Sequence, residues 1–210
     1  LLTIVLGSFG WFVVLIAFFS VGGLSTKFRY DEKLDRGVAE DNEGARGSSN
    51  VLGNAAVAFV AVVGFAASAH LSLPVPADTA FGFAFAGSIA AAMSDTLSSE
   101  IGGLYDSPRL ITTFQPVPPG TDGAVTWQGE VAGVVGAALV AGLALVLMPL
   151  SGAAPLAAGT VVVGGVAGMT VDSLLGATLE GDRIGNEAVN LLATLSGALV
   201  SGGIALVALV

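Results

Sequence analysis

The chain has 210 residues, of which 54% are hydrophobic and only 11% charged, and its mean hydropathy is +0.86. Soluble globular domains are about 25% charged, so this composition excludes an ordinary soluble domain and favours a membrane protein. Because the net charge is −9 and cysteine is absent, we expect no nucleic-acid partner, and disulfides and thiolate metal sites are excluded.

Six apolar blocks follow one another along the chain. They cover residues 1–24, 51–73, 79–93, 129–149, 156–171 and 188–210. A helix that crosses a bilayer needs about 20 predominantly apolar residues, and the third and fifth blocks reach that length only with the semi-polar residues that follow them. Continuous apolar runs argue against a membrane β-barrel, whose strands alternate. We therefore predict an all-α, polytopic membrane protein with about six transmembrane helices in a single integral membrane domain, residues 1–210.

The first block opens without a charged segment before it. A secretory signal peptide has such a segment and a cleavage pattern, and its apolar part is shorter. We interpret residues 1–24 as a transmembrane segment of a longer chain whose start is missing.

Charged residues gather in every second loop. All seven Lys and Arg fall within residues 25–50, 94–128 and 179–187, and of the sixteen acidic residues only Asp78 lies in the other loops. Basic loops face the cytoplasm in most membrane proteins. The pattern predicts an integral protein of the cell membrane whose active site faces the cytoplasm.

The third and fifth predicted helices end in related strings, SDTLSSEIG and DSLLGATLEG. Each has an acid followed by a hydroxyl residue, then small residues, then a Glu before Gly. On a helix, Asp172, Gly176 and Glu180 share one face, whereas Asp95 and Glu100 lie about 140° apart. We expect Asp95 and Glu100 to reach one ligand only if the helix end unwinds.

The second, fourth and sixth predicted helices also begin alike. They open with Gly53-Asn54, Gly129-Glu130 and Gly185-Asn186-Glu187. The separation in sequence between Gly53 and Gly129 is almost the same as that between Asp95 and Asp172. Equal separations are expected if a helical hairpin has been duplicated, so the pattern indicates such a duplication.

Three helix N-termini are therefore predicted at the same membrane face as the acids. Free N–H groups and the helix dipole suit phosphates there, and carboxylates together with phosphate oxygens suit Mg²⁺. Acids at membrane depth cost about 2.5–3.5 kcal/mol each, which marks them as functional candidates. In the alternative interpretation, Glu130 and Glu187 only stabilise helix dipoles and Glu180 lies in an ordinary solvated turn.

A long loop within residues 111–130 carries Pro116, Pro118 and Pro119 together with Gly120 and Gly123. Such a stiff loop could bind a nucleotide through its backbone N–H groups, or it could be a plain linker. The chain has no GxxxxGK[ST], GxGxxG, HExxH or GxSxG sequence, so the common nucleotide and hydrolase motifs are excluded.

Taken together, these strings resemble the family of transmembrane protein 19 and the plant phytyl phosphate kinase of tocopherol synthesis. The matching pieces are AFFSVGGLSTKF with Lys33, ARGSSNVLGN, SDTLSSEIG, LITTFQPVPPGTDGAVTWQGE, DSLLGATLEG and GNEAVNLLATLSGAL. They cover almost the whole chain in the family's order. One departure is Gln115, where we expect a basic residue more often.

The resemblance implies a kinase that transfers the γ-phosphoryl group of a nucleoside triphosphate, with CTP favoured, to a prenyl monophosphate in the bilayer. Mg²⁺ is the implied cofactor, because such transfer depends on positioning and charge neutralisation. The implied catalytic and metal-binding residues are Asp95, Glu100 and Asp172. The implied substrate- and nucleotide-binding residues are Lys33, Arg46, Asn54, Ser99, Arg109, Thr121, Gly123, Ser173, Glu180, Asn186 and Asn190.

A secondary transporter or ion pathway is the alternative function, since repeated hairpins and intramembrane acids suit it too. Transporter sites lie near the middle of the membrane, whereas every acid here except Asp78 is predicted at one membrane face. That difference in depth favours the kinase.

Overall fold

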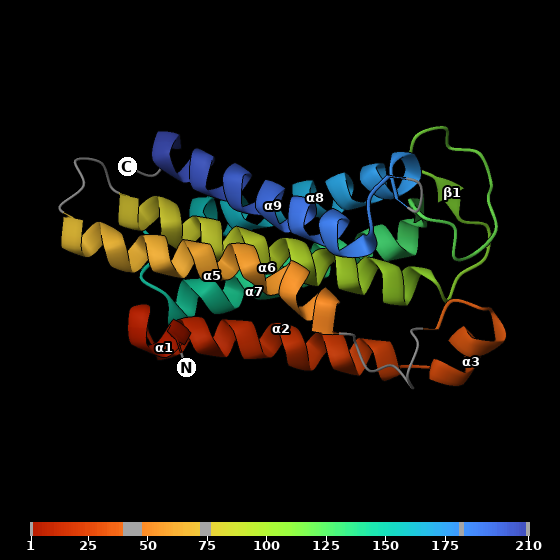
Figure 1. The fold of residues 1–210 in the computed structure, drawn as a ribbon, viewed down its shortest axis with the longest axis horizontal. Helices are drawn as coiled ribbons and strands as arrows, with labels where there is room; N and C mark the ends of the chain where they lie inside the picture. The colour runs from red at the N-terminus through yellow and green to blue at the C-terminus, as the bar shows by residue number, and fades with distance from the viewer. Residues whose placement is uncertain (1, 40–47, 72–76, 181–182, 209–210) are drawn as a thin grey trace.

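A computed structural model describes residues 2–39, 48–71, 77–180 and 183–208 of the chain. Long helices run side by side in one elongated bundle, and a small two-stranded sheet lies at one end (Figure 1). The helices are α1 (Leu2–Leu6), α2 (Phe9–Lys27), α3 (Tyr30–Asp35), α5 (Ser48–Leu71), α6 (Ala77–Gly102), α7 (Trp127–Leu147), α8 (Ala154–Thr178) and α9 (Asn186–Ala208). The strands are β1 (Arg109–Leu110) and β2 (Ala124–Val125).

The predicted all-α membrane fold is confirmed. Five helices are long and apolar enough to cross a membrane, namely α2, α6, α7, α8 and α9. The remaining predicted span corresponds to α5, whose apolar part, Gly53–Ser68, is shorter. The count of six therefore holds only approximately by length and composition.

Successive long helices alternate in direction. The connections from α2 to α5, from α6 to α7 and from α8 to α9 therefore lie at the same end of the bundle (Figure 1). We call this the charged end of the bundle. It comprises α3, the last turns of α6 and α8, the two strands with their loop, and the first turns of α7 and α9. The hairpins α5–α6 and α7–α8 both bring an acid-hydroxyl string to this end, as the predicted duplication requires, although the duplication itself stays a prediction.

Some predicted boundaries differ from the structure. The first apolar block contains a break, because Ser8 is extended (φ −162°, ψ 174°) between α1 and α2. Conversely, α6 and α8 continue beyond their apolar blocks, through Gly102 and Thr178. The small and hydroxyl residues there stay helical because neighbouring helices pack on them. The first string is helical to Gly102, whereas the second is helical only to Thr178, so Glu180 lies beyond the helix and does not share a helical face with Asp172 as predicted.

Helix α6 forms the centre of the bundle and contacts α2, α5, α7, α8 and α9. In its most apolar window 72% of residues are buried, against 33–39% in the other four spans. Small residues allow this close approach: a Cβ added at Gly168 would lie 2.3 Å from the Cβ of Ala91, on α6. Such small-residue contacts are typical of transmembrane helix packing.

The loop between β1 and β2 is folded onto the bundle. Its strands pair antiparallel, with Arg109 opposite Val125, and the Ile111 nitrogen donates to the Gly123 carbonyl at 3.0 Å. Gly123 has a positive φ of +71°, and a Cβ there would lie 2.4 Å from the Ser173 carbonyl oxygen of α8. The loop is thus a packed part of the charged end, and the plain-linker interpretation does not hold.

Candidate functional site

A cavity of about 510 Å³ lies at the charged end, between the bundle and the long loop. Eleven of the fourteen predicted site residues line it. They are Asn54, Asp95, Ser99, Glu100, Thr121, Gly123, Asp172, Ser173, Glu180, Asn186 and Asn190. Residues from four different helices and one loop, distant in sequence, therefore share a single cavity; their roles in it stay predictions.

Asp95 and Asp172 are paired across the cavity. Asp95 lies on α6 and Asp172 on α8, and their carboxyl groups lie close enough to interact directly. Two carboxylates this close repel each other unless a proton or a cation lies between them. Mg²⁺ is bound in proteins by one or two carboxylates plus phosphate oxygens, so the chemistry of this pair fits that ion.

Glu100 does not join that pair, although we predicted it as a third metal ligand. Helix α6 stays wound through Gly102, so Glu100 keeps its place on another side of the helix. Its Oε1 accepts from the Thr26 hydroxyl at 2.6 Å and its Oε2 accepts from the Lys33 ammonium at 2.6 Å. In the described part of the chain, no three acidic, His or Cys residues lie close enough to hold a metal ion. The three-carboxylate set is therefore not formed.

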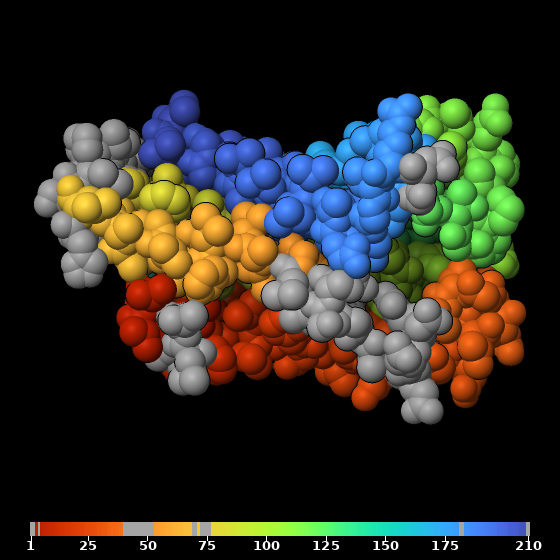
Figure 2. Space-filling view, viewed as in Figure 1, coloured from red at the N-terminus to blue at the C-terminus, as the bar shows by residue number. Residues whose placement is uncertain are grey.

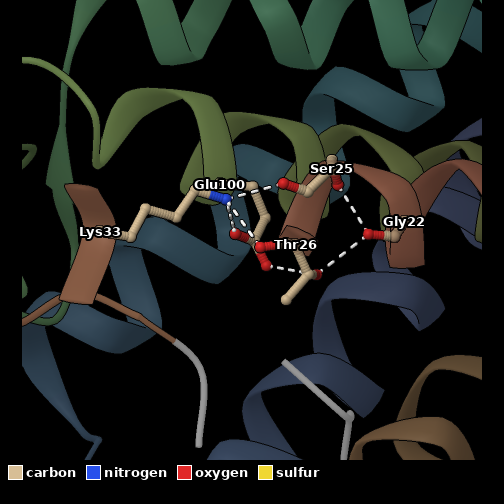
Figure 3. Close-up of polar contacts among 5 residues, drawn as sticks. All are labelled: Gly22, Ser25, Thr26, Lys33 and Glu100. Carbon is tan, nitrogen blue, oxygen red and sulfur yellow. Dashed lines mark hydrogen bonds and ion pairs between the residues drawn. The ribbon is translucent and has the colours of Figure 1, made fainter. Parts of the chain in front are cut away.

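Lys33 occupies a different place from the one predicted for a phosphate-binding lysine. Its side chain is 1% exposed, and the ammonium donates to the Ser25 and Thr26 carbonyls at the end of α2 as well as to Glu100 (Figure 3). A lysine has three N–H donors, and these three contacts use them all. Lys33 is thus an internal partner of Glu100.

The cavity is strongly acidic. Its lining includes Asp95, Glu100, Asp122, Asp172 and Glu180, and no Lys or Arg of the described chain lines it. Burial, and then the charges of Asp122 and Asp95, raise the pKa of Glu180 above its ordinary value of 4.5. A phosphate ligand would be repelled here unless cations accompany it.

Helix starts contribute the polar, uncharged part of the lining. The Thr126 side chain caps α7 by accepting from the Gly129 nitrogen at 3.1 Å. In the first turns of α9, the Asn190 amide donates to the Asn186 carbonyl and to its side-chain oxygen, at 3.0 and 2.9 Å. Asn54 lies in the second turn of α5. These ends provide the positive dipoles that phosphates favour.

One predicted cation, Arg109, is not brought into the cavity. Arg109 is exposed, and its guanidinium donates to the Phe114 carbonyl at 2.7 Å within the long loop. Its backbone lies between Val125 of β2 and Pro116, and its side chain is in solvent, so direct phosphate binding by Arg109 is not supported. Arg46 lies outside the described residues.

Sequence reasoning missed other lining residues. Asp122 and Thr126 lie in the string TDGAVTW, and a Thr before an apolar run is a usual N-cap signal. Gly37, Val38 and Ala39 also line the cavity, but no local pattern marks them. They come from a segment after α3 whose position depends entirely on tertiary contacts.

Comparisons with known proteins agree with this architecture. The model of a family described as integral membrane protein DUF92 matches residues 1–198. An uncharacterized membrane protein of Methanocaldococcus jannaschii is 37% identical over 91% of this chain and 75% of its own length. One of Synechocystis is 34% identical over 96% of this chain and 77% of its own.

A plant relative matches over a smaller share of its length. The chloroplastic protein VTE6 of Arabidopsis thaliana is 32% identical over 93% of this chain, which spans 58% of that protein. No solved structure matches this chain.

Proposed function

Since the chain belongs to the DUF92 family of integral membrane proteins, we propose that it is a membrane-embedded prenyl phosphate kinase. The resemblance to the family of transmembrane protein 19 and plant phytyl phosphate kinase is confirmed by the family match and by VTE6. Because the chain spans only 58% of VTE6, the activity is carried over as a proposal. The donor is a nucleoside triphosphate, with CTP favoured, and the acceptor is a prenyl monophosphate.

The observation that carries this proposal is the convergence of two kinds of group in one cavity. The Asp95–Asp172 pair supplies negative charge, and the starts of α7 and α9 supply N–H groups and positive dipoles. A nucleotide–cation complex needs both, since its cations seek carboxylates and its phosphates seek N–H donors. A site for a free anion would not need five acids.

In the proposed reaction a terminal oxygen of the prenyl monophosphate attacks the γ-phosphorus of the nucleotide. The bond from that phosphorus to the β–γ bridging oxygen breaks, and the nucleoside diphosphate leaves with the electron pair. Mg²⁺, held by Asp95 and Asp172, would neutralise phosphate charge. Asn186 and Asn190 would orient the phosphates, and the backbone around Thr121 would bind the nucleotide.

The position of the cavity supports a lipid-borne substrate. It lies at the end of the bundle, so a prenyl tail can remain at the level of the helices while its phosphate reaches Asp95. The basic residues gathered in the same loops suggest that this end faces the cytoplasm.

Depth and packing favour the kinase over a transporter. Residues 131–171 and 188–208 contain no charged side chain, and glycines close the middle of the bundle: a Cβ at Gly164 would lie 2.7 Å from the Gly197 carbonyl oxygen. A transporter site lies near the membrane middle, between broken helices, whereas the spans here are continuous.

The test is a direct assay of detergent-purified protein. Phytyl or geranylgeranyl phosphate is incubated with Mg²⁺ and each of γ-³²P-labelled CTP, ATP, GTP and UTP, and the lipid product is separated by thin-layer chromatography. Labelled prenyl diphosphate with at least one donor is expected, and the Asp172→Asn variant serves as the inactive control. No labelled diphosphate with any donor, while reconstituted vesicles move an ion or solute, would overturn the kinase in favour of transport.

A further inference from the structure

The segment from Phe28 to Ala39 folds back across the charged end, and we call it the strap. It contains α3 and leads from the end of α2 to the long loop, which lies next to it in the space-filling view (Figure 2). Val38 packs between α6 and that loop: its side chain lies 3.2 Å from a Cβ built at Gly103 and 3.5 Å from one built at Gly120. Gly37, Val38 and Ala39 line the cavity, so the end of the strap is one of its walls.

Lys33 fixes the strap to the bundle. Its ammonium reaches two carbonyls of α2 and the Glu100 carboxylate of α6 (Figure 3). Its own carbonyl accepts from the Val38 nitrogen at 3.0 Å. One residue therefore connects the bundle to the cavity wall. Glu100 is held on its other oxygen by Thr26.

A second ion pair between the strap and the rest of the chain is weaker. Arg36 pairs with Asp106 at 2.7 Å, but the Asp106 side chain is 84% exposed, and exposed ion pairs contribute little. The Lys33–Glu100 pair is 1% and 6% exposed, and removing one partner of such a pair leaves the other as an uncompensated buried charge. Of these two ion pairs, Lys33–Glu100 is therefore the one that holds the strap more strongly.

We propose that Lys33 and Glu100 form a latch that holds the strap as a wall of the cavity and so controls access to Asp95 and Asp172. Lys33 is a positioning residue, and Glu100 acts through the strap instead of through a metal ion. The consequence for catalysis rests on the proposed kinase function, whereas the latch itself does not.

The latch is tested by cysteine labelling, which needs no enzyme activity. The natural chain has no cysteine, so Ala39→Cys gives a single reporter on the wall and Thr113→Cys a reference in the exposed loop. Lys33→Met in the 210-residue chain in detergent should raise the maleimide labelling rate at position 39 by about threefold or more, because Ala39 is only half-exposed while the wall is in place and opening exposes it further. Position 113 should not change. Lys27→Met, at the chain's other and exposed lysine, is the matched control.

A double variant separates the latch from general stability. Adding Glu100→Gln to Lys33→Met removes the stranded buried charge, so the Tm should recover toward that of the natural chain. The strap still lacks its tether, so labelling at position 39 should stay fast. If labelling slows in parallel with the recovery of Tm, or if Lys33→Met leaves the labelling rate of position 39 unchanged, the latch is refuted.

An activity measurement connects the latch to the proposed reaction. Lys33→Met should raise the nucleotide KM more than it lowers kcat, because it loosens a wall without touching the reacting atoms. A fall in kcat alone would contradict a positioning role. Absence of kinase activity in the natural chain would refute the proposed function and leave the labelling result standing.

Discussion

Gly123 of the long loop lies directly against Gly176 of α8: a Cβ added at Gly176 would be 2.9 Å from the Gly123 nitrogen. Gly176 is one turn from Asp172 and one turn from Glu180, and its missing side chain makes the space that the loop occupies. The glycine that lies between Asp172 and Glu180 in the chain thus admits the backbone that closes the cavity.

This contact predicts that Gly123→Ala displaces the loop. The new Cβ would meet the Ser173 carbonyl and the Ala177 nitrogen, both at 2.4 Å, at a residue whose φ is already positive. Strain and overpacking of this kind cost about 1–3 kcal/mol each, so a lower Tm and a raised nucleotide KM are expected. Gly142→Ala, where nothing lies within 4 Å, should be neutral or slightly stabilising. Equal Tm values for the two variants would contradict the packed loop.

The Asp95–Asp172 pair is predicted to carry the reaction. Asp95→Asn or Asp172→Asn should lower kcat/KM more than about 100-fold, because several kcal/mol of phosphate charge stabilisation would be lost. The control is Asp78→Asn, at the opposite end of the bundle, where the carboxylate accepts from the Thr79 nitrogen. Isothermal titration calorimetry of Mg²⁺–nucleotide with each variant shows whether the affinity for the nucleotide falls together with the activity. An active Asp172→Asn enzyme would remove the pair from the mechanism.

Glu180 predicts a pH dependence of stability. Its pKa in the folded protein lies above 4.5, so the folded state binds a proton more tightly than the unfolded state. The contribution of Glu180 to the free energy of unfolding is therefore greatest below pH 4.5. It falls as the pH rises from there through the folded-state pKa of Glu180. Glu180→Gln should flatten this part of the profile and raise the Tm on its alkaline side. Thermal unfolding of both proteins between pH 4 and pH 8 measures this difference in Tm. A Tm that rises with pH in the natural protein but not in Glu180→Gln would contradict the prediction.

Orientation of the charged end can be measured in intact cells. Single cysteines at positions 113 and 78, which are both exposed, should react with a membrane-impermeant maleimide from opposite sides. Position 113 should be protected until the membrane is opened, since the charged end is expected to face the cytoplasm. Labelling of both positions from the same side would contradict the alternating helices.

The sequence by itself determined the class of fold and most of the cavity. Long apolar blocks demand helices in a bilayer, because no other open structure satisfies backbone polar groups there. The acid-hydroxyl strings then had to meet at one end, since consecutive spans alternate in direction. The sequence alone therefore predicts that Asp95, Asp172, Asn186 and Asn190 lie at the same end of the bundle.

Only the tertiary structure decided how individual charges are used. Glu100 looked like a metal ligand because it ends the same string as Asp95, but its partner is Lys33, 67 positions away. Arg109 looked like a phosphate ligand, yet its guanidinium donates to the Phe114 carbonyl within the long loop. Such partners depend on how a short strap and a loop pack across the bundle, and local residue patterns carry no information about contacts between distant segments.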